Sequence, residues 1–291
     1  MRYVNYHKHT HYSNIRTLDS IAKPEDYFKR ALDLGHTVYS LCEHGFQGNI
    51  YEAQTLYEKY NIRPIYAVEA YYTNDITDKS NRTGYHLMLI AMTKKARYEI
   101  NKILSVANTD GFYYKPRIDL NLLLSLSPED TIVTSACVMS PLFKKELVPN
   151  NDKGWHDNFL IPVMQHFGKN FYLETQDHVH PSQISFNKKI LALHNKYNIP
   201  LIHGCDSHYI LAEDSKYRDL FLKAKGINYP EEDGFILDYP EPDTIVQRYK
   251  EQGVLSDKQI KDALNNTLIF EDAEPIYTDK EFKIPKDRKS V

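Results

Sequence analysis

The chain has 291 residues, of which 42% are hydrophobic and 26% are charged, so it can bury a substantial core as one large α/β domain or two smaller ones. Its net charge of −3 argues against a protein held on nucleic acid mainly by bulk positive charge, although bound cations would change the field at a local site. With no apolar leader, no run long enough to span a bilayer and three cysteines without CxxC spacing, we expect a cytoplasmic protein without a membrane partner.

Short runs of β-branched and aromatic residues alternate with longer amphipathic runs over the first two thirds of the chain. This alternation predicts parallel strands joined by right-handed crossovers, hence an α/β fold. The expected strands lie near 2–7, 37–42, 64–70, 85–91, 131–136, 171–175 and 200–205, and the expected helices near 24–35, 47–60, 94–107, 154–167 and 182–197.

After residue 213 the strand pattern ends. Three helical patterns follow, "EDSKYRDLFLKAKG", "EPDTIVQRYKEQG" and "SDKQIKDALNNTLIFEDA", and then a polar segment. We therefore expect a main domain over 1–212, a helical extension packed on it over 213–275, and a polar tail over 276–291.

The stretch "YHKHTHYSNIRTLDS" places His7, His9 and His11 at every second position and Asp19 shortly after. Alternate side chains of a strand point to one face, and several imidazoles on one face suit a divalent metal ion. The alternative is a solvated strand end that is rich in histidine.

Ligand-type residues also occur at the ends of most other predicted strands. In a closed barrel these ends converge on one mouth, which favours a barrel over an open sheet. The exception is His86, which opens its strand rather than ending it. The candidates are His7, His9, Glu43, His44, Glu69, His86, Cys137, His178, His180, Asp206 and His208.

The mixture of nitrogen, oxygen and sulfur donors suits Zn, Mn or Fe rather than Ca. So many candidate ligands imply two or three ions, whereas a structural zinc site needs only four ligands. Clustered divalent ions lower the pKa of a bound water and neutralise a phosphate, so the pattern favours phosphate ester hydrolysis.

The motifs "HKHTHYS", "EH" after the second strand, "VE" after the third, "YHLMLIA", "SAC" and "GCDSHY" resemble, in order, those of the polymerase and histidinol phosphatase (PHP) superfamily. The resemblance covers residues 1 to about 275. It is closer to the PHP domain at the N-terminus of the bacterial DNA polymerase III alpha subunit, because 111–124 and 237–249 also look like stretches of that branch.

The resemblance implies a distorted seven-stranded (β/α) barrel with three divalent ions that would activate a hydroxide for attack on phosphorus. His7, His9, Glu69 and Asp206 would hold one ion; Glu69, His86 and Cys137 a second; and Asp19, His44 and His208 the third. Asp206, His208 and Glu69 would then be the catalytic residues. His11 and Glu43 replace residue types more usual in the family, but neither change removes an implied ligand.

Candidate substrate contacts are His178, Arg117 with its neighbour Lys115, and His11. A guanidinium matches the oxygens of a phosphate, but Arg117 could equally form a surface ion pair with Asp119. His11 could equally be solvated.

Three functions are compatible with these residues. The first is a 3′–5′ exonuclease on DNA, the second a phosphatase for a small phosphorylated molecule, and the third a non-catalytic scaffold that binds a replication protein. The polymerase palm that would follow residue 275 in the resembling branch is absent from the sequence, so a free-standing PHP protein or a fragment of a split polymerase is expected.

Overall fold

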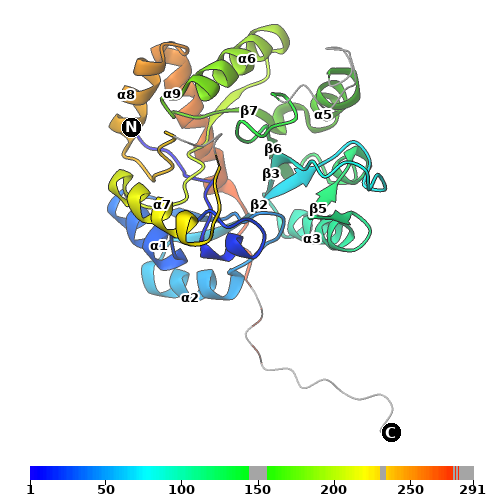
Figure 1. The fold of residues 1–291 in the computed structure, drawn as a ribbon, viewed down its shortest axis with the longest axis horizontal. Helices are drawn as coiled ribbons and strands as arrows, with labels where there is room; N and C mark the ends of the chain where they lie inside the picture. Colours follow the sequence, from blue (N-terminus) through cyan, green and yellow to red (C-terminus); the bar gives the residue numbers. More distant parts are fainter. Residues whose placement is uncertain (144–155, 230–233, 278, 280, 282–291) are drawn as a thin grey trace, which may run out of the picture.

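A single curled β-sheet organises the molecule, and helices cover its outer face (Figure 1). The computed structural model describes residues 1–143, 156–229, 234–277, 279 and 281. Within them the strand order is β4-β5-β2-β3-β6-β7-β8, and β1 pairs with β2 off this path. The strands are β1 Val38–Leu41, β2 Arg63–Tyr72, β3 Tyr85–Ala91, β4 Phe112–Tyr113, β5 Lys115–Ile118, β6 Thr131–Thr134, β7 Phe171–Thr175 and β8 Leu201–His203.

The helices follow the expected alternation and begin at recognisable signals. Pro24 opens α1 with Glu25 and Asp26 in its first turn, and the Thr93 side chain caps α3 by accepting from the backbone amide of Ala96. The helices are α1 Pro24–Asp33, α2 Ile50–Tyr60, α3 Lys94–Asn108, α4 Leu120–Leu123, α5 Ile161–Phe167, α6 Pro181–Tyr197, α7 Ser215–Ala224, α8 Pro242–Gln252 and α9 Asp257–Asn266. A π-helical turn, His156–Leu160, precedes α5, and the expected residues 154–155 lie outside the described part.

The α/β class is confirmed, but the expectation that all strands are parallel is wrong for β3. This strand is antiparallel to both β2 and β6, with His86 opposite Tyr71. The reason is the connection: β2 and β3 are joined by residues 73–84, which contain no helix to carry the chain back to the far end of the sheet. The first residues of β3 therefore lie beside the last residues of β2.

The expected strand over 2–7 is also absent. The segment is extended and buried, but it joins the sheet only through a bridge between Lys8 and Ser207, where His9 N donates to Ser207 O at 2.8 Å. One of its backbone amides, that of Val4, donates instead to the Thr267 side chain at 2.7 Å. The N-terminal segment thus lies beside the residues that follow β8 without becoming a regular strand.

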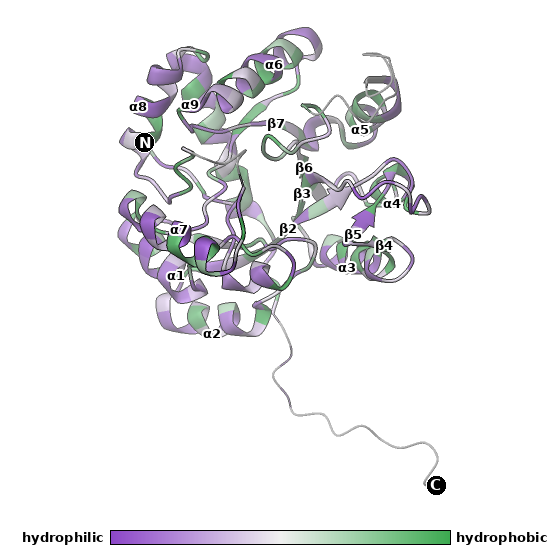
Figure 2. Cartoon of the chain, in the orientation of Figure 1, coloured by the Kyte–Doolittle hydropathy of each residue, from purple (hydrophilic) through white to green (hydrophobic). Residues whose placement is uncertain are grey.

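Alternation along β2 shows how the sheet separates two layers of core. Tyr66, Val68 and Ala70 pack in the larger cluster with the helices, whereas Ile65 and Ala67 belong to a smaller cluster on the other face. Glu69 continues the second face, so the inner side of β2 changes from apolar to acidic toward its end. Figure 2 shows hydrophobic stretches among the strands and hydrophilic residues over much of the outer helices.

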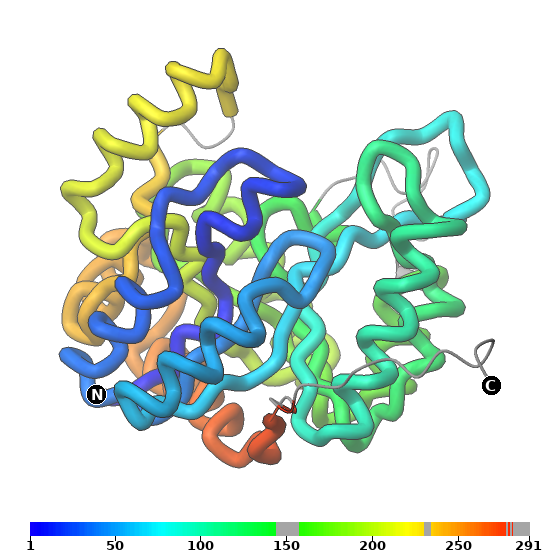
Figure 3. Tube along the Cα trace, turned by 90° about the horizontal axis from the view of Figure 1, so that it is seen from below, coloured from blue at the N-terminus to red at the C-terminus, as the bar shows by residue number. Residues whose placement is uncertain are grey.

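The segment after residue 212 packs against both ends of the sheet. In Figure 3, α7 (yellow) lies at the same end as the loop after His9 (dark blue), and the segment after α9 (orange to red) lies at the opposite end. Arg218 of α7 donates to the backbone oxygen of Asp19 at 2.6 Å, and the rings of Phe270 and Tyr6 lie 4.7 Å apart. Tyr249 and Leu264 share the larger core cluster with the strands, so the curled sheet and the extension form one continuous core. No described helix combines the length and apolarity needed to cross a bilayer.

An ion cluster ties α8 to the sheet. Arg248 makes a paired contact with Asp238, at 2.7 and 2.8 Å, and a third bond of 3.2 Å to Asp177, which follows β7. All three side chains are almost fully buried. Burial raises the pKa of Asp177 to about 7, although Arg248 opposes this shift.

We predict that Arg248→Met lowers the free energy of unfolding by about 3–5 kcal/mol, because it leaves two buried carboxylates without their cation. Chemical denaturation measures this. The matched control is Lys250→Met on the same helix, whose exposed ion pair with Asp257 contributes at most about 1 kcal/mol. Equal stability of the two variants would contradict the prediction.

Candidate metal centre

The nine side chains predicted as metal ligands meet at one end of the sheet. They come from the N-terminal segment, the loop before α1, the turn after β1, β2, β3, and the loops after β6 and β8. Because β3 is antiparallel, its first residues reach the same end, which explains how His86 joins the group. Each of the nine is within 4 Å of at least one other: His7, His9, Asp19, His44, Glu69, His86, Cys137, Asp206 and His208.

Glu69 lies at the centre of the cluster and faces different imidazoles with its two oxygens. Its Oε1 is 2.8 Å from His86 Nδ1 and 3.3 Å from His7 Nε2. Its Oε2 is 2.7 Å from His44 Nδ1 and 3.3 Å from His9 Nε2. This position between two groups of ligands is the one a bridging carboxylate requires.

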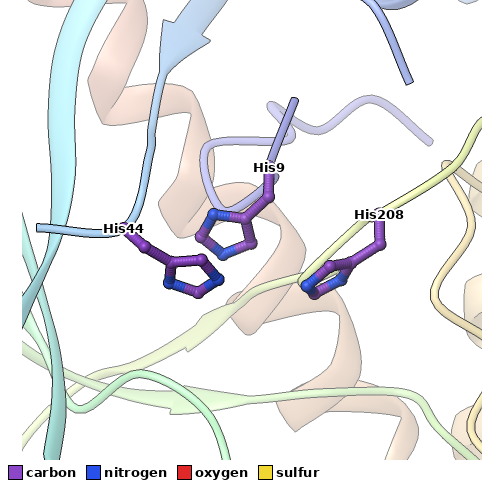
Figure 4. Close-up of side chains that lie close together, drawn as sticks. All are labelled: His9, His44 and His208. Carbon is purple, nitrogen blue, oxygen red and sulfur yellow. The ribbon is translucent and has the colours of Figure 1, made fainter. Parts of the chain in front are cut away.

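Three histidines, His9, His44 and His208, form a compact group (Figure 4). The rings of His9 and His44 are stacked with centroids 3.9 Å apart, and His208 lies 4.9 Å from His9. Asp19 Oδ2 is 2.8 Å from His44 Nε2 and 3.5 Å from His208 Nε2.

Many polar atoms of this cluster are buried but make no hydrogen bond of acceptable geometry. They are His7 Nε2, His9 Nε2, Asp19 Oδ1, His44 Nδ1, Glu69 Oε2 and Asp206 Oδ1. Unpaired buried polar atoms are costly, so such a concentration indicates that another species satisfies them. Among the described residues three groups have ligand atoms within 4.8 Å of one another: His9–His44–His208, His7–His9–Glu69 and Glu69–His86–Cys137. The donor set therefore fits borderline divalent metal ions.

The ionisation of the acidic side chains and the cysteine also fits bound divalent cations. Burial would raise the pKa of Glu69, but the neighbouring His86 and His44 hold it well below its usual value. Burial similarly opposes ionisation of Asp206, yet His7 keeps its pKa well below the usual range. Burial raises the pKa of the Cys137 thiol well above its usual value, so a thiolate there requires a cation beside it.

Glu174 on β7 orients His7 and was not predicted from the sequence. Its Oε1 lies 2.6 Å from His7 Nδ1, and its Oε2 accepts from the hydroxyls of Tyr6 and Thr134 at 2.6 and 2.7 Å. A proton on Nδ1 shared with a carboxylate leaves the lone pair of Nε2 facing the cluster. A Cβ on Gly204 would lie 2.1 Å from Glu174 Oε1, so a side chain there would displace this support. The available signal was an acidic residue inside an otherwise apolar strand.

Glu43 lies outside the ligand cluster although it ends a predicted strand. It accepts from the hydroxyls of Thr10 and Ser13, each at 2.5 Å, and from the Asn49 amide at 2.6 Å. Ser13 Oγ is also 3.3 Å from His9 Nδ1. Glu43 therefore fixes the loop after His9 through its hydrogen bonds with Thr10 and Ser13.

The three predicted substrate contacts lie in different environments. His178 is buried; its Nδ1 is 2.8 Å from the backbone oxygen of Ile236, its Nε2 is unpaired, and burial lowers its pKa to about 4. His11 is exposed and its ring lies against that of Tyr12, with centroids 4.6 Å apart. Arg117 is fully buried outside the cluster.

The guanidinium of Arg117 is occupied by the protein backbone. It donates to the carbonyl oxygens of Ile76, Asp78, Asn81 and Gly111 at 2.7–3.2 Å. These bonds fix the 73–84 loop to β5, and binding of a phosphate would require them to break. The alternative interpretation, an ion pair of Arg117 with Asp119, is also wrong, because Asp119 caps α4 by accepting from Leu122 N.

A cavity of about 370 Å³ opens beside the ligands. Its polar lining includes Asp19, Glu69, His86 and Asp206, together with Lys115 and Gln176. Its apolar wall consists of Val138, Met139, Tyr229, Phe235 and Leu237. The last three come from the extension, which the sequence did not connect to the site.

The chain belongs to the PHP-domain family, whose model matches residues 5–178. This agrees with the expected class of metal-dependent hydrolases. Among curated relatives, the DNA polymerase III alpha subunits of Borreliella burgdorferi and Aquifex aeolicus are 31% and 30% identical over 76% and 73% of this chain. The chain spans about a fifth of their length, 19% in both cases.

Two solved structures also match. A candidate metal-dependent phosphoesterase from Bifidobacterium adolescentis is 12% identical, with a TM-score of 0.45 over 83% of this chain and 94% of that one. An amidohydrolase from Chromobacterium violaceum is 11% identical, with a TM-score of 0.43 over 70% of this chain and 87% of that one.

We predict that removing divalent metal with a chelator lowers the melting temperature of the protein by about 5–10 °C. A ligand that binds only the folded state at about 100 times its dissociation constant adds about 2.7 kcal/mol. Differential scanning calorimetry with and without added Mn²⁺ or Zn²⁺ measures the change, and metal readdition is the control. An unchanged melting temperature would argue against occupied metal sites.

For Arg117 we predict that substitution by Lys lowers the free energy of unfolding by about 2–4 kcal/mol, because an ammonium cannot reach four carbonyls and leaves buried acceptors unpaired. Urea denaturation measures this, with exposed Arg2→Lys as the matched control. Undiminished stability together with a raised KM would restore Arg117 as a substrate contact.

Proposed function

We propose that this chain is a metal-dependent phosphoesterase with a three-ion centre that removes nucleotides from the 3′ end of DNA. The observation that carries the proposal is the convergence of nine ligand-type side chains, with six unpaired buried atoms among them, beside a cavity. A structural site would need neither so many donors nor an adjoining cavity.

The distances support one division of the ligands. His7, His9, Glu69 and Asp206 would hold one ion, Glu69 with His86 and Cys137 a second, and Asp19, His44 and His208 a third. When bound, such ions supply charge neutralisation for a phosphate and lower the pKa of a bound water toward neutrality.

The residues around the ligands provide orientation and charge. Glu174 holds His7, and Glu43 holds the His9 loop through Ser13, so two ligands keep their geometry before substrate arrives. Lys115 places an ammonium on the cavity wall, where it can pair with a phosphate oxygen.

His178 stays neutral at pH 7 because burial lowers its pKa to about 4. Its Nδ1 faces a carbonyl, which can only accept, so Nδ1 carries the proton and the unpaired Nε2 is an acceptor. We assign it the role of accepting a hydrogen bond from a substrate hydroxyl near Phe235, whose ring lies 5.1 Å away.

The choice of DNA as substrate is supported by the relatives, which are named as DNA polymerase subunits. A replication setting and a replication protein as partner follow from the same relationship. The volume of about 370 Å³ suits a single nucleotide at a chain end rather than a duplex. The same volume favours a small phosphomonoester as the second candidate substrate.

We predict that Asp206→Asn reduces hydrolysis by more than about 100-fold, because it removes a carboxylate charge from the ion held with Glu69. The assay follows stepwise shortening of a 5′-labelled single-stranded oligonucleotide beside p-nitrophenyl phosphate, with Mn²⁺ added. Asp33→Asn on the exposed face of α1 is the matched control.

Shortening by wild type and by Asp33→Asn, but not by Asp206→Asn, would support the exonuclease. Cleavage of the monoester alone would transfer the assignment to the phosphatase. No turnover by a metal-loaded wild-type sample would refute both and leave the scaffold.

A further inference from the structure

We propose that the β4–β5 hairpin and the neighbouring 73–84 loop form a binding surface for single-stranded nucleic acid beside the cavity. The inference rests on the proposed function, because it states how the protein holds the part of the DNA strand that precedes the 3′ end being cleaved. It concerns residues that neither the ligand set nor the cavity accounts for, and it is carried by exposed aromatic rings paired with cations.

The hairpin presents aromatic side chains to solvent. Phe112 and Tyr114 are 43% and 59% exposed, and the ring of Tyr113 meets that of Tyr114 edge to face at 4.8 Å. Tyr114 has a φ of +62°, a conformation that a tyrosine rarely adopts. Strain of this kind persists where the surrounding structure fixes it, and here it holds a large apolar ring in water at the tip of the hairpin.

Cations lie against these rings. The guanidinium of Arg82 is 4.2 Å from the centre of the Tyr114 ring, and that of Arg16 is 5.9 Å from Phe112. Both arginines are exposed, and they come from separate segments. Aromatic faces that stack bases, flanked by cations that contact phosphates, are the combination that binds single strands without reading their sequence.

The surface is continuous with the cavity. Lys115 directly follows Tyr114 and lines the cavity, with its ammonium 4.4 Å from the Tyr71 ring. Pro116 packs on the turn that carries His44: a Cβ on Gly45 would lie 2.7 Å from Pro116 Cγ. A single-stranded nucleic acid whose 3′ end lies among the metal ligands would therefore pass over the hairpin. Figure 3 shows the hairpin (green) beside the 73–84 loop (cyan).

The buried Arg117 keeps this arrangement rigid. Its bonds to the carbonyls of Asp78 and Asn81 join the loop to β5, so Arg82 is held near Tyr114 before any ligand arrives. Two acidic residues share the loop, Asp75 and Asp78, and their carboxylates accept from Thr77 and Ser80 of the loop itself. This local positive and aromatic surface differs from the chain as a whole, whose net charge is −3.

The test measures binding of a fluorescent twelve-residue oligothymidylate by anisotropy, in the Asp206→Asn background so that the probe stays intact. Tyr114→Asn removes the ring and suits the positive φ; we expect binding weaker by about tenfold, the effect of losing one base–aromatic stack. Tyr114→Trp should retain binding. Tyr98→Asn, which alters a tyrosine of the same 59% exposure on α3, is the control.

A second variant tests the cation. Arg82→Gln should reduce the slope of log affinity against log salt by about 0.7, the value for one phosphate contact on a single strand. Unchanged melting temperatures would show that both variants are folded.

Equal binding by Tyr114→Asn and its parent would overturn the inference, as would absence of binding by the parent or a duplex probe that binds as tightly as the single strand. These outcomes are separate from failure of the proposed function, which wild-type hydrolysis of the oligonucleotide decides independently of the hairpin variants.

Discussion

A buried carboxylate surrounded by imidazoles sets the conditions that the rest of the fold must meet. Glu69 has both oxygens within 3.3 Å of histidine nitrogens, with no exposure to water that could screen its charge. Such a group is tolerated only when neighbours fix its partners in place. The sheet provides this by changing the inner face of β2 from Ile65 and Ala67 to Glu69. Cations are the natural counterpart, because carboxylates, imidazoles and a thiol otherwise leave polar atoms unpaired.

The reversed direction of β3 follows from the same requirement. A parallel β3 would have sent His86 to the far end of the sheet, away from Glu69 and Cys137. The direct 73–84 connection instead returns the chain at once and sets His86 opposite Tyr71. That loop is then available as a surface, and Arg117 fixes it through backbone carbonyls. The metal ligands and the proposed nucleic-acid surface thus share one local departure from regular α/β topology.

Sequence patterns predicted most helices and strands, because the 3.6- and 2-residue periods are local properties, but the short elements α4, β4 and β5 were missed. The resemblance to the PHP superfamily predicted which nine side chains meet; the strand-end pattern alone included Glu43, His178 and His180 and did not include Asp19. The direction of β3 was missed because periodicity carries no information about the path between strands. The prediction of a strand over 2–7 was wrong because the backbone amide of Val4 donates to the side chain of Thr267, more than 260 residues away in the sequence. Glu174 and the apolar wall are likewise long-range features, visible only once β7 and the extension are packed.

The wall formed by Tyr229, Phe235 and Leu237 has a consequence for how this protein can diversify. All nine ligands lie at or before residue 208, whereas these wall residues come after it. Mutations in the later stretch therefore alter what fits against the reacting centre without touching the groups that react. Within a lineage, the metal ligands can be retained while this later part of the wall changes, so the chemistry can be conserved while the preferred substrate changes.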